Sequence, residues 1–278
     1  MLQWTIDLTS STFPKTHSDH EPLPMQIIHF WRSTLLLMMV GTLVQLPTLS
    51  GDPPELANSL LQQSGFTGGF IVELGSTSGE LAKELRQNES TQIHGLVRKP
   101  ETLSVIRESV RKTSQYGDIA FDNFSGSVLP YTDNLVNLLI AEDLGDVPLD
   151  EVLRVLVPKG VALIKSGDKW EKTVKPRPED IDEWSHYLHD ATGNSVAHDD
   201  QVAPPRHLQW VGSPRWSRHH DRMASMSALV STGGRMFYIM DEGSRISIQL
   251  PPKWKLIARD AFNGSVLWKR DIENWQTH

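Results

Sequence analysis

A ten-residue stretch near residue 75 constrains the fold more than any other part of the chain. The apolar run Phe70–Leu74 leads into a turn that opens with Gly75 and closes with Gly79, and a helix-forming segment begins at Glu80. A strand, a tight glycine turn and a helix in this order can present free backbone N–H groups to a nucleotide-like ligand. The stretch therefore predicts an α/β fold with a ligand site at the carboxyl end of its first strand.

The residues after this turn continue to alternate between strand and helix patterns. The apolar periods predict strands at 70–74, 92–97, 119–121, 135–141 and 161–164, and helices at 55–64, 78–87, 101–112 and from Pro148 to a stop at Lys159-Gly160. Such alternation implies right-handed crossovers and a parallel sheet. We therefore expect a doubly wound, Rossmann-like domain over residues 52–170.

Composition narrows the class of protein. The chain has 278 residues, of which 38% are hydrophobic and 22% charged, values that are typical of a globular protein. Its net charge of −7 gives no indication of nucleic-acid binding, so we expect no nucleic-acid partner. The absence of cysteine excludes disulfides, thiolate metal sites and a cysteine nucleophile.

The N-terminal segment predicts an export signal. Residues 33–46 are uncharged and largely apolar, Arg32 precedes them, and Ser50 is a small residue suited to cleavage. This run is short for a bilayer span and suits a signal-peptide core, so we expect a signal at 25–50 and a gene-model extension at 1–24. The protein would then be exported to the periplasm or the medium, with no stable membrane span after signal removal. If the segment is instead a helix of the mature fold, the protein would be cytoplasmic.

A change in composition marks a second module. Seven of the nine tryptophans follow Lys169, and seven of the eleven histidines follow Asp180. Residues 171–183 are rich in proline and alternating charge, which predicts a linker. In the part that follows, 184–278, we expect antiparallel strands at 228–231, 236–240, 246–249 and 256–260, separated by glycine turns.

Two further segments carry a family resemblance. Residues 129–134 read Leu-Pro-Tyr-Thr-Asp-Asn, and residues 151–160 read Glu-Val-Leu-Arg-Val-Leu-Val-Pro-Lys-Gly. With the glycine turn, they resemble in order and spacing the "LPF-x-D" and "E-x-x-R-V-L-K-P-G-G" segments of class I S-adenosylmethionine-dependent methyltransferases. The resemblance implies S-adenosylmethionine as cofactor and an unidentified small-molecule acceptor. It implies no catalytic residue, because many such enzymes rely on aligning the methyl donor with the acceptor.

The resemblance also implies cofactor contacts, at positions where the chain departs from the family. The implied cofactor-binding residues are Glu73, Gly75, Ser76, Thr77, Gly79, Arg98 and Ser125. Thr77 replaces a glycine that lies against the methionine part of the cofactor, and Ser125 replaces an acidic residue that contacts adenine. Arg98 replaces the acidic residue that accepts hydrogen bonds from the ribose, and a guanidinium has no acceptor. We therefore expect cofactor binding to be impaired or lost.

The C-terminal part resembles a different family. Residues 256–269 are similar to the repeat of quinoprotein-type (pyrroloquinoline quinone dehydrogenase-like) β-propellers, with Asn263-Gly264 as hairpin turn and Trp268 packing between blades. The order of the two parts resembles large exported bacterial proteins. Closure needs at least about four blades of roughly 40–45 residues. We therefore expect one or two blades of a fragment that associates with the missing blades, and no pyrroloquinoline quinone cofactor in this chain; whether a quinone site exists cannot be read from the sequence.

Histidine spacing raises the question of a metal. His186 and His189 lie three residues apart, and His219-His220-Asp221 follows. Histidines at this spacing share one face of a helix and could ligate a metal. The alternative is polar anchoring of a loop-rich segment. Because no further ligand spacing matches a known site, we expect no metal.

Two functions from different classes remain open. The first is a methyltransferase-type domain with impaired cofactor binding, fused to a truncated quinoprotein-like propeller. The second is a non-catalytic extracytoplasmic scaffold or binding module of a propeller protein. Whether the chain is an enzyme at all depends on whether the cofactor binds.

Overall fold

The computed structural model describes residues 52–201, 208–213, 218, 226–247 and 249–273. The segments expected at 1–24 and 25–50 lie outside these residues, as does His219-His220-Asp221. None of the helices in the described part has the length and apolar character that a bilayer crossing requires.

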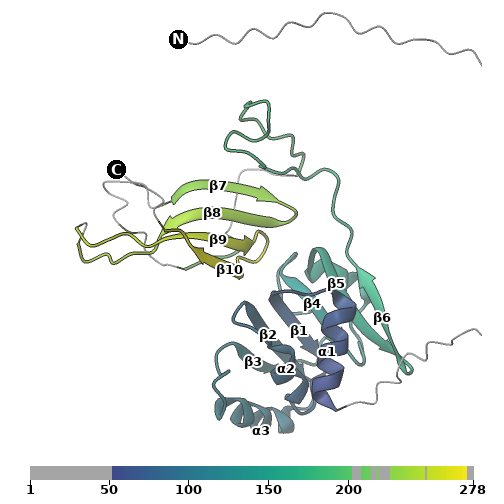
Figure 1. Cartoon of the computed structure of the whole chain (residues 1–278). Coiled ribbons are helices and arrows are strands. Elements are labelled where there is room, and N and C mark those ends of the chain that lie inside the picture. The colour runs from purple at the N-terminus through teal and green to yellow at the C-terminus, as the bar shows by residue number, and fades with distance from the viewer. Residues whose placement is uncertain (1–51, 202–207, 214–217, 219–225, 248, 274–278) are drawn as a thin grey trace, which may run out of the picture. The chain divides into compact units, whose positions relative to one another are not determined.

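The glycine turn belongs to a six-stranded sheet with the predicted topology (Figure 1). Its strands are β1 (Gly69–Leu74), β2 (Thr91–Val97), β3 (Ile119–Asn123), β4 (Val136–Ala141), β5 (Leu156–Ser166) and β6 (Lys169–Val174). The strand order is β3-β2-β1-β4-β5-β6; β1 to β5 are parallel, and β6 is antiparallel to β5. The chain therefore changes direction of winding between β1 and β4, the point at which doubly wound sheets bind ligands. The predicted Rossmann-like fold is confirmed.

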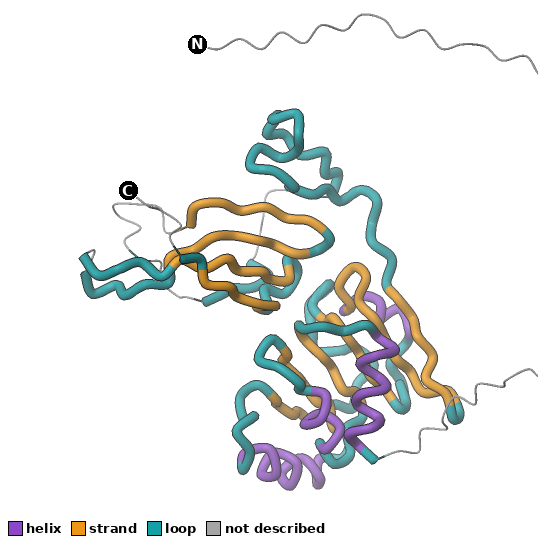
Figure 2. The backbone as a smooth tube through the Cα atoms, viewed as in Figure 1, coloured by secondary structure: helices purple, strands orange, loops and turns teal. Residues whose placement is uncertain are grey.

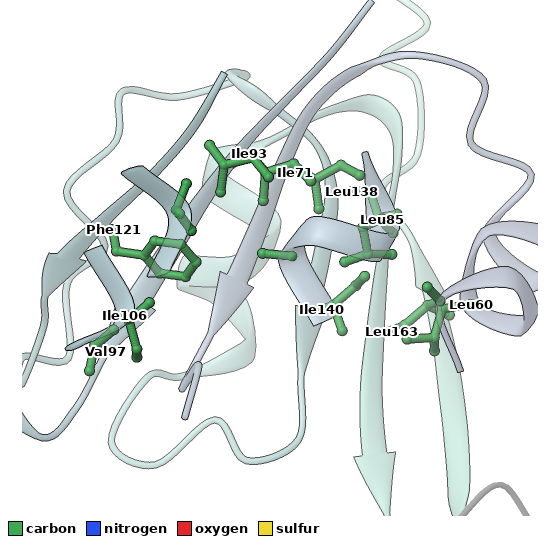
Figure 3. Packing of buried hydrophobic residues seen from close by; sticks show 14 of the residues in the cluster. Leu60, Ile71, Leu85, Ile93, Val97, Ile106, Phe121, Leu138, Ile140 and Leu163 are labelled. Carbon is green, nitrogen blue, oxygen red and sulfur yellow. The ribbon is translucent and has the colours of Figure 1, made fainter. Parts of the chain in front are cut away.

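Helices cover both faces of this sheet. Successive side chains of a strand point to opposite faces, and apolar strand residues on both faces need covering. One face packs against α1 (Pro53–Ser64), α2 (Glu80–Leu85) and α3 (Pro100–Arg111), and Leu60, Leu85 and Ile106 meet strand residues there (Figure 3). The other face packs against α4 (Leu149–Val155) and the loop residues Phe124, Leu129 and Val147. Both faces are thus apolar, as the continuous apolar pattern of β4 predicts.

Two elements differ from the sequence expectation. The last helix ends at Val155 rather than at Lys159-Gly160, and strand β5 begins at once with Leu156. The register between β4 and β5 shifts there, with Lys159 in the left-handed region at φ 67°, so residues 157–160 form an irregular stretch of strand. Strand β6 extends the sheet to Val174, into the segment that proline and charge suggested was a linker.

The second part of the chain forms a separate four-stranded antiparallel sheet, not closed into a barrel (Figure 2). Its strands are β7 (Met226–Thr232), β8 (Arg235–Asp241), β9 (Trp254–Asp260) and β10 (Val266–Asp271), in the order β10-β9-β8-β7. Gly233 and Gly234, both with positive φ, make the first turn. The antiparallel class predicted for this part is confirmed.

One predicted strand of this part is wrong. Ile246 and Ser247 lie in the loop between β8 and β9, and Ile246 is 91% exposed. An apolar run of this length can be a strand or an exposed loop, and only neighbours able to cover it make it a strand. Within the described residues that loop is instead tied to the sheet by Asp241, whose carboxylate accepts hydrogen bonds from the N–H groups of Gly243 and Lys253.

Candidate functional site

The predicted site lies at the carboxyl ends of β1, β2 and β4. Five of the seven residues predicted to contact the cofactor belong to the end of β1 and the turn into α2, and Arg98 follows β2. The side chain of Arg98 reaches this turn, since its Nε lies 3.7 Å from the position that a Cβ on Gly75 would take. Ser125 follows β3 with an exposed side chain, and within the described residues it makes no hydrogen bond to the others. The structure therefore brings the turn and Arg98 together, whereas Ser125 stands on the same rim after β3, the strand beside β2, without a hydrogen bond to them within the described residues.

The first N–H groups of the turn are already used. The N–H groups of Gly75 and Ser76 both donate to the carbonyl of Leu96, at N···O distances of 2.8 and 3.1 Å. Gly75 holds φ at 86°, a conformation that residues with a Cβ rarely adopt. The turn is thus fastened to the end of β2, and these two donors point at protein rather than at a ligand.

Gly79 closes the turn for reasons of packing. Its φ is 75°, and a Cβ there would lie 2.8 Å from Cγ2 of Ile106. Close approach of the turn to α3 therefore requires a glycine at this position. Thr77, in contrast, is exposed, so its side chain points away from this packing.

Arg98 spans the point at which the strand order reverses. Its guanidinium donates from one nitrogen, Nη2, to the carbonyls of Leu144 (2.7 Å) and Asp143 (3.2 Å) in the loop after β4. A Cβ added to Gly145 would lie 2.5 Å from Nη1, so the guanidinium sits directly on this loop. Because β2 and β4 flank β1 on opposite sides, the side chain crosses the end of β1. It occupies the place where a doubly wound sheet holds a ligand.

Glu73, near the end of β1, carries a buried carboxyl. Glu73 is 8% exposed, and its Oε2 has no hydrogen-bond partner within the described residues. Burial raises the pKa of Glu73 to about 7, and the nearby carboxylate of Glu142 adds to the rise. The Ser76 hydroxyl is close enough to offset part of the pKa shift but lacks hydrogen-bond geometry. Near neutral pH this group therefore exchanges a proton, a property often found at ligand sites.

Comparisons with known proteins find similar folds among solved structures but assign the chain to no family. No family model matches the chain, and no curated relative matches its sequence. Its fold resembles those of a candidate S-adenosyl-L-methionine-dependent methyltransferase from Methanococcus maripaludis (19% identity, TM-score 0.37) and a candidate sarcosine dimethylglycine methyltransferase from Galdieria sulphuraria (24%, 0.36). It also resembles geranyl diphosphate C-methyltransferase from Streptomyces coelicolor (15%, 0.37).

These matches are partial. Each covers 40% of this chain, and the chain spans only about half of the three proteins, 53%, 45% and 44% of their lengths. At such identities and TM-scores they carry no argument about activity. Any inference about activity has to rest on the strand order and the geometry of the site instead.

A polar chain on the α4 face of the sheet was not anticipated from sequence. Nδ1 of His94 in β2 lies 2.8 Å from the Tyr131 hydroxyl, and Nε2 lies 3.1 Å from Asp122 Oδ2. Burial lowers the pKa of His94 and raises that of Tyr131, so the phenol stays protonated. These contacts join β2 and β3 to the loop before β4. Asp122 and Tyr131 lie 28 and 37 residues from His94; the register of β2 with β3 brings Asp122 close, and the loop before β4 brings Tyr131 close.

Proposed function

We propose that residues 52–170 form a methyltransferase-type domain in which binding of S-adenosylmethionine has been lost or severely impaired. The observation that carries the proposal is the guanidinium of Arg98, which bridges the ends of β2 and β4 across β1. A ribose held there would need an acceptor for its hydroxyl hydrogens, and a guanidinium supplies none. The guanidinium of Arg98 would also place a second positive charge next to the sulfonium of the cofactor.

The size of the effect follows from these two changes. Loss of hydrogen bonds to a charged acceptor costs about 1.5–3 kcal/mol. That free energy corresponds to roughly a ten- to hundredfold loss of affinity, before any repulsion between the two cations. The N–H groups of Gly75 and Ser76 donate to Leu96, so they offer no compensating contact.

Titration calorimetry of the full chain tests the proposal. S-adenosylmethionine and its demethylated product S-adenosylhomocysteine should give no heat at millimolar concentration with the unmodified protein. The double variant Arg98→Asp, Thr77→Gly restores an acceptor and removes the crowding Cβ, and it should bind in the micromolar range. Lys99→Asp is the matched control, because Lys99 is exposed and adjacent to Arg98. It makes the same change of charge without touching the bridge.

The outcomes separate the hypotheses clearly. Micromolar binding by the unmodified chain contradicts the proposal and supports an active small-molecule methyltransferase. Restored binding in the double variant but not in Lys99→Asp assigns the defect to the bridge. Absence of binding in every variant, with unchanged folding, indicates a domain that has become a scaffold.

A second candidate function comes from the antiparallel sheet. The hairpin between β9 and β10 is built by Asp260, whose Oδ1 accepts the N–H groups of Phe262 and Asn263, and by Asn263, whose Oδ1 accepts that of Ser265. The ring of Trp268 packs at 6.0 Å from that of Phe237. These features support a blade of a quinoprotein-like propeller, and hence a non-catalytic scaffold or binding module that acts with further blades. Export through the segment at 25–50 belongs to the same proposal.

A further inference from the structure

Two histidines and an aspartate lie close together in the segment between β6 and β7. Asp182, His189 and His198 each offer one ligand atom, and these atoms lie within 4.8 Å of one another. Oδ2 of Asp182 accepts hydrogen bonds from Nε2 of His189 and from the backbone N–H of His198, both at 2.6 Å. The three residues thus connect the two ends of one loop. Imidazole nitrogen with carboxylate oxygen is a donor set typical of zinc and other first-row divalent cations.

The buried histidine has an unsatisfied nitrogen. His189 is 3% exposed, and its Nδ1 makes no hydrogen bond within the described residues. The carboxylate of Asp190 lies on this side of the ring, with its Oδ2 3.6 Å from Nδ1. Asp190 is itself held by the N–H and hydroxyl of Thr192. Metal-bound histidines commonly direct their second ring nitrogen at such a carboxylate, which fixes the tautomer and orients the ring.

The backbone and the neighbouring rings hold the histidine at this position. His189 has φ 69°, in the left-handed region that side-chain-bearing residues seldom adopt. The rings of Trp184 and His198 lie edge-on to its imidazole, with centroids 5.3 and 5.4 Å away. Trp184 in turn exchanges hydrogen bonds with Ser231 of the edge strand β7. The imidazole is therefore oriented before any ion arrives.

The distances fit a small cation. Bonds of about 2.0–2.1 Å in tetrahedral geometry separate ligand atoms by roughly 3.3 Å. The present spacing runs from 2.6 Å between Asp182 and His189 up to 4.8 Å at most. Movements below about 1.5 Å, within the reach of exposed His198, would bring the atoms to that separation.

We propose that Asp182, His189 and His198 form a binding site for Zn²⁺ or a similar first-row divalent cation. Asp190 would act as a positioning residue through Nδ1 of His189. Three protein ligands leave a fourth position for water. The ion would close the loop between Asp182 and His198 and hold Trp184 against β7. This proposal departs from the expectation of no metal that was drawn from the sequence. It also uses other residues than the helical pair considered there, His186 and His189, because the segment is a loop and His186 is exposed.

Titration of the metal-free full chain with ZnCl₂ tests the site. We expect one tight site per chain, with a dissociation constant in the micromolar range or below. Substituting Co²⁺ should give the visible absorption bands of a four-coordinate N/O site. His198→Gln should weaken the tight site at least tenfold, and because His198 is exposed, this substitution leaves the fold intact. Asp190→Asn should weaken it by about tenfold at most, as expected for a positioning residue.

His186→Gln is the matched control, since His186 lies in the same loop outside the cluster. It should leave the tight site unchanged, as should a change at His94, which lies in the six-stranded sheet. The alternative is a metal-free cluster, in which His189 lies between Asp182 and Asp190 without an ion. That alternative predicts no tight site, and equal zinc binding by the unmodified chain and His198→Gln. Either result overturns the proposal.

Discussion

The guanidinium groups of Arg98 and Arg259 both donate hydrogen bonds to backbone carbonyls, but they differ in burial. Arg259 is 4% exposed in β9, and its guanidinium donates to the Tyr238 hydroxyl and the Gly264 carbonyl, both at 2.6 Å, and to the carbonyl of Ser213. Arg98 is half-buried and donates from a single nitrogen to two carbonyls of an exposed loop. Tyr238 and Gly264 are buried and Ser213 alone is exposed, so water has little access to the partners of Arg259, whereas water can replace Arg98.

This difference separates structural arginines from arginines that occupy ligand space. A buried donor whose acceptors are also buried cannot be removed without leaving them unsatisfied. A donor at the rim of an α/β sheet can be removed at little cost, so its presence there affects ligands more than stability. The comparison therefore makes opposite predictions for the two sheets.

Arg259→Met should have the largest effect on stability. It leaves the buried Tyr238 hydroxyl and the buried Gly264 carbonyl without their donor, and we expect a loss of about 4 kcal/mol. Urea unfolding followed by tryptophan fluorescence measures it, because Trp254 and Trp268 lie in this sheet.

Arg235→Met is the control for that change, since Arg235 is exposed in the neighbouring strand β8. It removes the same charge and should change stability by less than about 0.5 kcal/mol. Equal effects of the two substitutions would mean that charge, not burial, explains the role of Arg259.

Glu73→Gln should have the next largest effect, and only at high pH. The pKa of Glu73 is raised from 4.5 to about 7 in the folded protein, so the native state keeps a proton that the unfolded chain releases between these values. The stability associated with the protonated carboxyl is fully present below about pH 4.5 and is lost as the pH rises through 7. Above pH 8, the glutamine variant should be more stable than the unmodified protein by up to about 3 kcal/mol.

Urea unfolding at pH 5 and pH 8 checks this sign. The difference between the variant and the unmodified protein should be small at pH 5 and should grow as the pH rises. Glu84→Gln removes an exposed carboxyl from the adjoining helix and should give no such trend. If Glu73→Gln is less stable than the unmodified protein at both pH values, the ionised carboxylate of Glu73 is not destabilised by burial, and the prediction is wrong.

The sequence predicts the regular elements well where local pattern decides them. The five parallel strands and the glycine turn follow from apolar runs and from the conformational demands of Gly75 and Gly79. Strand β6 could not be predicted, because its polar residues alternate with Trp170 and Val174 on an exposed edge. The end of α4 was also missed, since Leu156 continues the helical period although it begins a strand.

The candidate sites show the same limit more sharply. The sequence identifies Arg98 as a departure from the family pattern but not where its guanidinium goes, because the acceptors on Asp143 and Leu144 are backbone atoms 45 and 46 residues away. Similarly, His189 is visible as a histidine, whereas its partners Asp182 and His198 lie at spacings that match no helical or zinc-binding pattern. These contacts depend on how the loops close, and loop closure produces no periodic pattern in the sequence.

Arg98→Met should have the smallest effect on stability, below about 1 kcal/mol. Methionine keeps much of the apolar stem, and water can solvate the carbonyls of Asp143 and Leu144 because their loop is largely exposed. Urea unfolding under the conditions used for Arg259→Met makes the two values directly comparable. A loss above 2 kcal/mol for Arg98→Met would remove the distinction between the two arginines. In that case, Arg98 joins β2 to β4 as a structural element, and the rim of the sheet is closed for reasons of stability rather than through loss of a ligand.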